Sequence, residues 1–243
     1  MSREVLTLAQ AAAHAHVDAN ELRHVAQRGE IEAIRRGEEW LFEHRALDEW
    51  AQRSLLAAGD RDLRARHREM SGEASRERRE AWRVSDLFRA ETIDLEVGAK
   101  AKGGLIRDMT DLADRGGLVY DPEALFKSLV EREEAASTAI GEGVALLHPR
   151  FHDPYLFEES FVAYGRTTRP VFFGAPDGAG TRHFFLICST DHDAHLRILA
   201  RLAVLAHGTD FIERLDAAED ADAVLAAIRE SEAPYLTPRH EKC

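Results

Sequence analysis

The stretch GEGVALLHPR at residues 141–150 contains a histidine that could accept a phosphoryl group. An arginine before this stretch and a second histidine after it could bind the same group. His148 ends the apolar run of that stretch, and a neutral imidazole can act as a nucleophile. Arg132 falls at the end of the preceding predicted helix, and a guanidinium can bind phosphoryl oxygens through paired hydrogen bonds. His195 begins a later predicted helix, whose first N–H groups favour an anion. Together these residues predict a phosphoryl-transfer site; the alternative is that His148 only ends a strand.

Three other segments could suggest chemistry and are interpreted differently. The run DHDAH at 191–195 offers histidines and carboxylates, but no second ligand-spaced pair supports zinc, so we predict no metal. The glycine-rich run GAPDGAG at 174–180 lacks the Gly-Lys-Ser/Thr ending of a nucleotide-binding loop and predicts a hairpin turn. Cys188 lies in the apolar run FFLICST and is predicted to be a buried strand residue.

The charge of this 243-residue chain is distributed unevenly, and its length allows one large domain or two modest ones. The formal net charge is −12, and residues 84–243 alone hold 17 Lys/Arg against 28 Asp/Glu. A surface that binds nucleic acid over its whole extent is therefore excluded, and any DNA contact must be local. The chain has two cysteines, no apolar run of transmembrane length and no signal-peptide pattern. We therefore expect a cytoplasmic protein without membrane insertion.

The sequence pattern divides the chain into zones at 1–53, 54–83 and 84–236, followed by a tail at 237–243. The first zone has the order helix, turn, helix, hairpin, helix, with Thr7 and Asp18 as expected helix caps. The second zone is charged, has few large apolar residues and predicts a solvated, helical linker. The third zone alternates helical and strand patterns, which predicts an α/β domain. Its strands are expected near 144–148, 161–165, 171–173 and 183–189, and its helices near 105–112, 121–130, 196–208, 211–215 and 221–228.

The third zone resembles a known family. The segments EREEAASTAIGEGVALLHPR and RPVFFGAPDGAGTRHFFLICSTDHDAHLRILARLAVL are similar, element by element, to the fructose/mannitol-type and nitrogen-regulatory enzyme IIA domains of the bacterial phosphoenolpyruvate:sugar phosphotransferase system. The resemblance implies a mixed sheet flanked by helices and no metal or organic cofactor. It implies that His148 accepts a phosphoryl group from the histidine phosphocarrier protein, that Arg132 neutralises its charge and that His195 orients it. Thr138 and the backbone around Gly141 would complete a phosphate cradle.

The resemblance breaks at the residues that follow the histidine. The family usually has Pro-His-Gly there, often followed by lysine, whereas this chain has Leu147, His148, Pro149 and Arg150. Proline has no backbone N–H, so a phosphate contact from that amide is lost, and Arg150 is expected to replace the attraction. The alternative is a retained fold with a weakened site.

The first zone resembles the excisionase/MerR-type winged helix-turn-helix. The matching features are the Leu-Thr-x-x-x-Ala-Ala opening, the Gly-x-Ile-x-Ala-x-Arg hairpin entry, the Trp-x-Phe second strand and the Leu-Asp-x-Trp closing helix. The resemblance implies that the second helix enters the major groove and that the hairpin tip meets phosphates. The residues it would present are Arg23, His24, Gln27 and Arg28 from the helix and Arg35 and Arg36 from the hairpin. Five glutamates surround them, so dimerisation or protein docking remains an alternative.

The two resemblances together predict a regulatory protein that couples the phosphorylation state of His148 to DNA binding. Two alternatives stay open. One is a plain phosphocarrier in sugar uptake that passes its phosphoryl group to a cysteine-bearing IIB domain. The other is a DNA-binding or docking module without phosphorylation. A homodimer is compatible with all three.

Overall fold

The computed structural model describes residues 5–56, 62–63, 66–67, 82–150, 155–208 and 210–236. The chain forms two compact units, 1–73 and 74–243, and each is treated by itself. Most of the predicted linker at 54–83 and the whole tail at 237–243 lie outside the described residues. None of the helices in the described ranges combines the length and hydropathy that a membrane crossing requires.

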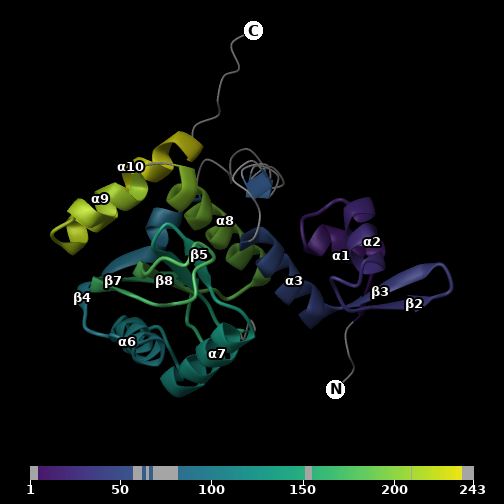
Figure 1. Ribbon diagram of the computed structural model, residues 1–243, viewed down its shortest axis with the longest axis horizontal. Coiled ribbons are helices and arrows are strands. Elements are labelled where there is room, and N and C mark those ends of the chain that lie inside the picture. Colours follow the sequence, from purple (N-terminus) through teal and green to yellow (C-terminus); the bar gives the residue numbers. More distant parts are fainter. Residues whose placement is uncertain are drawn as a thin grey trace, which may run out of the picture. The chain divides into compact units, whose positions relative to one another are not determined.

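The N-terminal unit has the predicted order, with one additional strand at its start (Figure 1). Its three-stranded antiparallel sheet has the strand order β1-β3-β2. The elements are β1 (Val5–Thr7), α1 (Leu8–His14), α2 (Ala19–Gln27), β2 (Ala33–Arg36), β3 (Glu39–Glu43) and α3 (His44–Leu56).

Local sequence signals fix the boundaries of this unit. Thr7 and Gln10 form a reciprocal capping box at the start of α1, and Asp18 caps α2 by accepting from the N–H groups of Asn20 and Glu21. Gly37 has a φ of +66° in the turn between β2 and β3, a conformation that glycine adopts at little cost. The predicted caps and the hairpin are therefore confirmed. The core contains Leu22, Val25, Phe42, Leu47 and Trp50.

The C-terminal unit is a five-stranded mixed sheet with helices on both faces, as predicted. The strand order is β4-β7-β8-β6-β5, in which β4–β7 and β6–β8 are parallel and the other neighbours antiparallel. Figure 1 shows α6 and α7 on one side of the sheet and α8 and α10 on the other. The elements are a 3-10 turn η1 (Val84–Leu87), β4 (Phe88–Val97), α6 (Lys102–Arg115), α7 (Pro122–Ala135), β5 (Ala139–Gly141), β6 (Val144–Leu147), β7 (Phe161–Val171), β8 (Thr181–Cys188), α8 (His192–Gly208), α9 (Phe211–Ala217) and α10 (Ala221–Leu236).

Strand alternation decides which side each strand residue faces. Along β6, Ala145 and Leu147 belong to the core cluster with α6 and α7, so Leu146 and the residue after the strand, His148, face the side of α8. Along β8, Cys188 joins the α6–α7 cluster and is fully buried, as predicted. The period of two therefore directs His148 toward the helix that carries the second histidine.

The strand predictions needed three corrections. The separate strands expected at 161–165 and 171–173 are one strand, β7, and neither β4 nor β5 was expected. The pairing of β7 with β8 is irregular between Arg166 and Val171, which includes Pro170. Proline removes a ladder hydrogen bond without ending the extended backbone, which explains why the sequence suggested a break. The GAPDGAG segment connects the antiparallel strands β7 and β8, as the hairpin prediction required.

Candidate active site

His148 lies directly after β6 and its side chain is fully buried. The Nδ1 atom lies 2.8 Å from the carbonyl oxygen of Leu146. A carbonyl oxygen can only accept, so Nδ1 carries the proton and donates it. The lone pair of the neutral ring is then on Nε2, which is the nucleophilic atom.

Arg132 contacts that same atom. It is buried in the last turn of α7, and its Nε donates to His148 Nε2 at 3.0 Å. A second guanidinium nitrogen donates to the carbonyl oxygen of Ala136 at 2.9 Å, which ties the side chain to the end of its own helix. A fixed positive charge beside an imidazole disfavours protonation of the ring. The arrangement therefore keeps Nε2 available as a lone-pair donor.

His195 supplies the second ring of the site from the first turn of α8. The centroids of the His148 and His195 rings lie 4.9 Å apart, in an edge-to-face arrangement. Ser189 Oγ lies 3.1 Å from His195 Nδ1 and so fixes the orientation of this ring. The sequence placed Arg132, His148 and His195 at one site, and the structure brings these three side chains together.

Thr138 lies beside β6 but its hydroxyl is held by another residue. Its carbonyl oxygen accepts from the N–H of Leu146, two residues before His148. Glu133 Oε2 accepts from both the N–H and the Oγ1 of Thr138, at 2.8 and 2.7 Å. The other oxygen of Glu133 accepts from Lys102 Nζ at 2.6 Å. Sequence reasoning missed Glu133, because a glutamate at a helix end looks solvent-exposed and nothing in its spacing indicates that it turns inward.

Gly141 is not brought to the histidine ring. It pairs with Val144 at the start of β6, and His148 follows four residues later, about 13 Å along a strand. The φ of Gly141 is +93°, and a Cβ there would lie 3.2 Å from Asp177 Oδ2. Glycine at this position therefore serves a tight turn against Asp177, whose carboxylate also accepts from the N–H of Glu142.

The residues after the histidine offer little backbone to a phosphate. Pro149 is buried and has no N–H, and the N–H of Arg150 donates to Ser128 Oγ at 3.0 Å. The Arg150 side chain is half-buried, two residues from the ring. The Arg150 guanidinium, which the sequence predicted to compensate for the missing amide, thus lies close to the ring along the chain.

The six side chains expected to meet DNA are all exposed. Arg23, His24 and Gln27 lie on α2, Arg28 caps its C-terminal end, and Arg35 and Arg36 lie on the β2–β3 hairpin. Three of these arginines have local partners: Arg28 pairs with Glu30, Arg23 donates to Asn20, and Arg35 donates to the carbonyl oxygen of Gly37. The positive charge that these residues would offer to DNA is therefore partly neutralised.

The comparisons with known proteins cover most of the C-terminal unit. Residues 86–231 match the family model described as "Phosphoenolpyruvate-dependent sugar phosphotransferase system, EIIA 2". A nitrogen regulatory protein of Bradyrhizobium diazoefficiens is 35% identical over 148 residues, which are 60% of this chain and 94% of that protein. A fructose-specific EIIABC component of Bacillus subtilis is 29% identical over 150 residues, 61% of this chain but 23% of that longer protein.

Solved structures agree with this match. The nitrogen regulatory protein IIA of Neisseria meningitidis superposes with a TM-score of 0.54 at 26% identity, covering 60% of this chain and 98% of that one. IIA mannitol from Escherichia coli gives a TM-score of 0.52 at 25% identity, covering 58% of this chain and 98% of that one. At the other end, residues 5–54 match a helix-turn-helix domain model.

The family model covers more than half of the chain, and the strand order, the buried histidine pair and the arginine lie within it. The chain therefore belongs to the EIIA type-2 family of the phosphoenolpyruvate-dependent sugar phosphotransferase system, as a nitrogen regulatory IIA-like protein with an N-terminal helix-turn-helix domain.

Proposed function

We propose that this protein is a regulatory phosphoryl acceptor, phosphorylated on Nε2 of His148 by a histidine phosphocarrier protein, that transmits this state to DNA through its N-terminal unit. One observation carries the proposal. The bond from His148 Nδ1 to the carbonyl of Leu146 puts the ring lone pair on Nε2, where the Arg132 guanidinium is already in contact.

The transfer step follows from this geometry. The Nε2 lone pair of His148 bonds to the phosphorus of the donor's phosphohistidine as the donor N–P bond breaks, and the donor imidazole leaves with that electron pair. The ring of His148 becomes positively charged, and the carbonyl of Leu146 stabilises its Nδ1–H. Arg132 gives up its bond to Nε2 as the N–P bond forms, and its N–H groups turn to phosphoryl oxygens.

The burial of the site sets a condition on the transfer. His148 and His195 are 0% and 1% exposed, so a donor histidine cannot reach Nε2 unless the surroundings of the ring rearrange. We infer that docking of the phosphocarrier drives this rearrangement and that His195, held by Ser189, keeps the ring in position meanwhile. His195 is thus a positioning residue in this proposal.

The N-terminal unit supports the regulatory half of the proposal. Its second helix and its hairpin present exposed arginines in the order expected of a helix-turn-helix with a wing. A phosphoryl group adds roughly −1.5 to −2 charges to a unit that is already acidic. The added negative charge would weaken contacts with acidic surfaces and strengthen contacts with basic ones. In this way phosphorylation would change the partners of the C-terminal unit and alter DNA binding.

The test is phosphorylation of the full chain. Untagged protein is incubated with labelled phosphoenolpyruvate, enzyme I and the histidine phosphocarrier. We expect acid-labile label on the wild type and on His207→Ala, which replaces an exposed histidine at the end of α8. His148→Ala should take up no label, and titration of promoter DNA should differ between the phosphorylated and unphosphorylated wild type.

Three results would contradict the proposal. If the wild type takes up no label under conditions that label a fructose-type IIA domain, the protein is a docking or DNA-binding module without phosphorylation. Label that persists in His148→Ala would place the acceptor elsewhere. Rapid onward transfer to a cysteine-bearing IIB domain, with DNA binding unchanged by phosphorylation, would favour the plain sugar-uptake phosphocarrier.

A further inference from the structure

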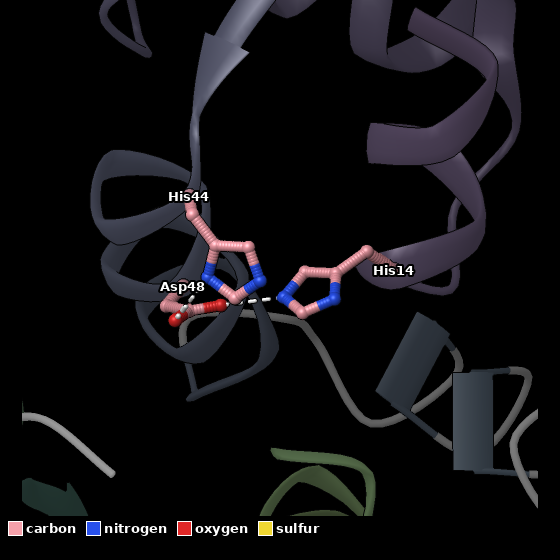
Figure 2. A group of neighbouring side chains, drawn as sticks. All are labelled: His14, His44 and Asp48. Atoms are coloured by element: carbon pink, nitrogen blue, oxygen red, sulfur yellow. Dashed lines mark hydrogen bonds and ion pairs between the residues drawn. The ribbon is translucent and has the colours of Figure 1, made fainter. Parts of the chain in front are cut away.

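A second cluster of histidines lies in the N-terminal unit, far along the sequence from the phosphoryl site. Figure 2 shows that His14, His44 and Asp48 point toward one another. His14 Nε2 lies 2.6 Å from Asp48 Oδ1, and His44 Nδ1 lies 3.3 Å from Asp48 Oδ2. The two imidazole centroids are 4.4 Å apart. Each residue offers one atom that could bind a metal ion, and these three atoms all lie within 4.8 Å of one another.

The elements that carry these residues make the cluster a chelating arrangement. His44 and Asp48 are four residues apart in the first turns of α3, a spacing that places both side chains on one face of a helix. His14 ends α1 and approaches from a different element. A cation bound by all three would therefore join the end of the first helix to the start of the third, with α2 between them in the chain.

The donor chemistry selects the class of ion. Two neutral imidazoles and one carboxylate carry a charge of −1, and nitrogen-rich sets of this kind suit zinc and similar transition ions rather than magnesium or calcium. Donors on a tetrahedral zinc lie about 3.3 Å apart for bonds of about 2 Å. To reach that value, the 2.6 Å contact between His14 and Asp48 must lengthen and any separation near the 4.8 Å limit must shorten.

The partial exposure of the three side chains also fits a site that an ion can enter from solvent. The side chains of His14 and Asp48 are 18% and 16% exposed, and that of His44 is 37% exposed. Donors are thus held in place by their surroundings yet remain open on one side for an incoming ion and a water ligand.

From this geometry we propose that His14, His44 and Asp48 form a binding site for one divalent transition ion of the zinc type. The bound ion links α1 to α3 and so stabilises the fold of the N-terminal unit, which includes α2. The metal site does not depend on phosphorylation of His148. A test that shows no metal binding would therefore leave the proposed function unaffected.

The experiment measures zinc binding to the untagged full chain. Protein stripped with a chelator is titrated with Zn²⁺ in competition with a chromophoric zinc indicator, and with Co²⁺ for its absorption spectrum. The variants are His44→Ala and Asp48→Asn, with His207→Ala as the matched control because the chain has 12 histidines that could bind weakly. Far-ultraviolet circular dichroism checks that each variant is folded, and His44, the most exposed of the three, is the least demanding replacement.

We expect the wild type and His207→Ala to bind one Zn²⁺ that His44→Ala and Asp48→Asn bind about tenfold more weakly or worse. The wild type should also give the visible Co²⁺ bands of a four-coordinate site, and these bands should be lost in both cluster variants. The proposal is overturned if the wild type does not outcompete the indicator, or if all four proteins bind Zn²⁺ equally. In either case the cluster is only a hydrogen-bonded His–Asp–His group.

Discussion

At the scale of single residues, the sequence predicted which side chains of the candidate site lie together better than it predicted the residues that hold them. Arg132, His148 and His195 were predicted from residue type and position, and they meet in the structure. Glu133 and Ser189, which fix Thr138 and His195, were missed. A short polar side chain at a helix or strand end carries no periodic signal, because its partner is decided by the tertiary fold. The same limit hid the cluster of His14, His44 and Asp48, because His14 lies 30 residues before His44 in the chain.

His183 is a buried histidine with no part in the phosphoryl site. It lies on β8, where its Nδ1 is 2.8 Å from the hydroxyl of Tyr164 and its Nε2 is 3.4 Å from Asp216 Oδ1. Burial lowers the pKa of His183 from 6.5 to about 4, and the nearby Arg182 and Arg166 also lower it, against the raising effect of Asp216. The folded protein therefore holds this ring neutral under mildly acidic conditions.

Stability of the C-terminal unit should therefore decrease between pH 6.5 and 4. In that window the unfolded chain binds a proton at His183 that the folded chain does not, so the free energy of unfolding falls as the pH falls, by up to about 3 kcal/mol. Native-state hydrogen exchange at the β8 amides at pH 7 and pH 4.5 measures the loss. His183→Gln should reduce the pH dependence, whereas His207→Ala should retain it. An unchanged pH dependence in His183→Gln would show that other groups cause it.

At the scale of elements, apolar periodicity predicted helices more completely than strands. The helical faces of α6, α7 and α8 carry leucines at regular spacing, and each of these helices was expected. The strand β4 was not, because its sequence FRAETIDLEV mixes charged and apolar residues, as an edge strand with one partly open face can. The strand β5 has only three residues, too few for a periodic signal.

One buried carboxylate joins elements from opposite ends of the C-terminal unit. Glu232 of α10 is fully buried and accepts from the N–H groups of Val84 and Ser85, at 2.7 and 3.1 Å. The same carboxylate pairs with Arg201 of α8 at 2.6 Å. Burial lowers the pKa of Arg201, while Glu232 raises it. The carboxylate thus compensates a buried cation and fixes the start of the unit to its last helix.

Replacing this carboxylate should be costly. Glu232→Gln leaves the Arg201 charge buried without its counter-charge, and loss of one partner of such a pair costs about 3–5 kcal/mol. Calorimetry of the C-terminal transition measures the effect. Glu230→Gln is the matched control, because Glu230 is exposed and pairs with Arg214 at the surface, where a much smaller destabilisation is expected. Equal destabilisation by the two changes would contradict the argument.

At the scale of the whole molecule, charge limits how the protein can bind DNA. The chain has a net charge of −12, and residues 1–53 themselves hold 7 Lys/Arg against 10 Asp/Glu. Exposed arginines lie on α3 as well as on α2 and the β2–β3 hairpin, but only those of α2, its C-terminal end and the hairpin are expected to face DNA, and Arg28 is already paired with Glu30. Few phosphates can therefore be neutralised by one copy of the unit, and its binding should respond to salt only weakly.

The salt dependence of DNA binding tests this limit directly. For a random-sequence duplex we expect a plot of log K against log salt concentration with a slope of about −3, because about three arginines replace counterions. Arg35→Ala/Arg36→Ala should make the slope shallower by about 2, since each phosphate contact contributes about 1. Arg229→Ala removes an equally exposed arginine from α10 in the other unit and should leave the slope unchanged. If the hairpin variant keeps the wild-type slope, the hairpin does not meet the phosphates. The helix-turn-helix unit would then bind DNA, if at all, through α2 alone.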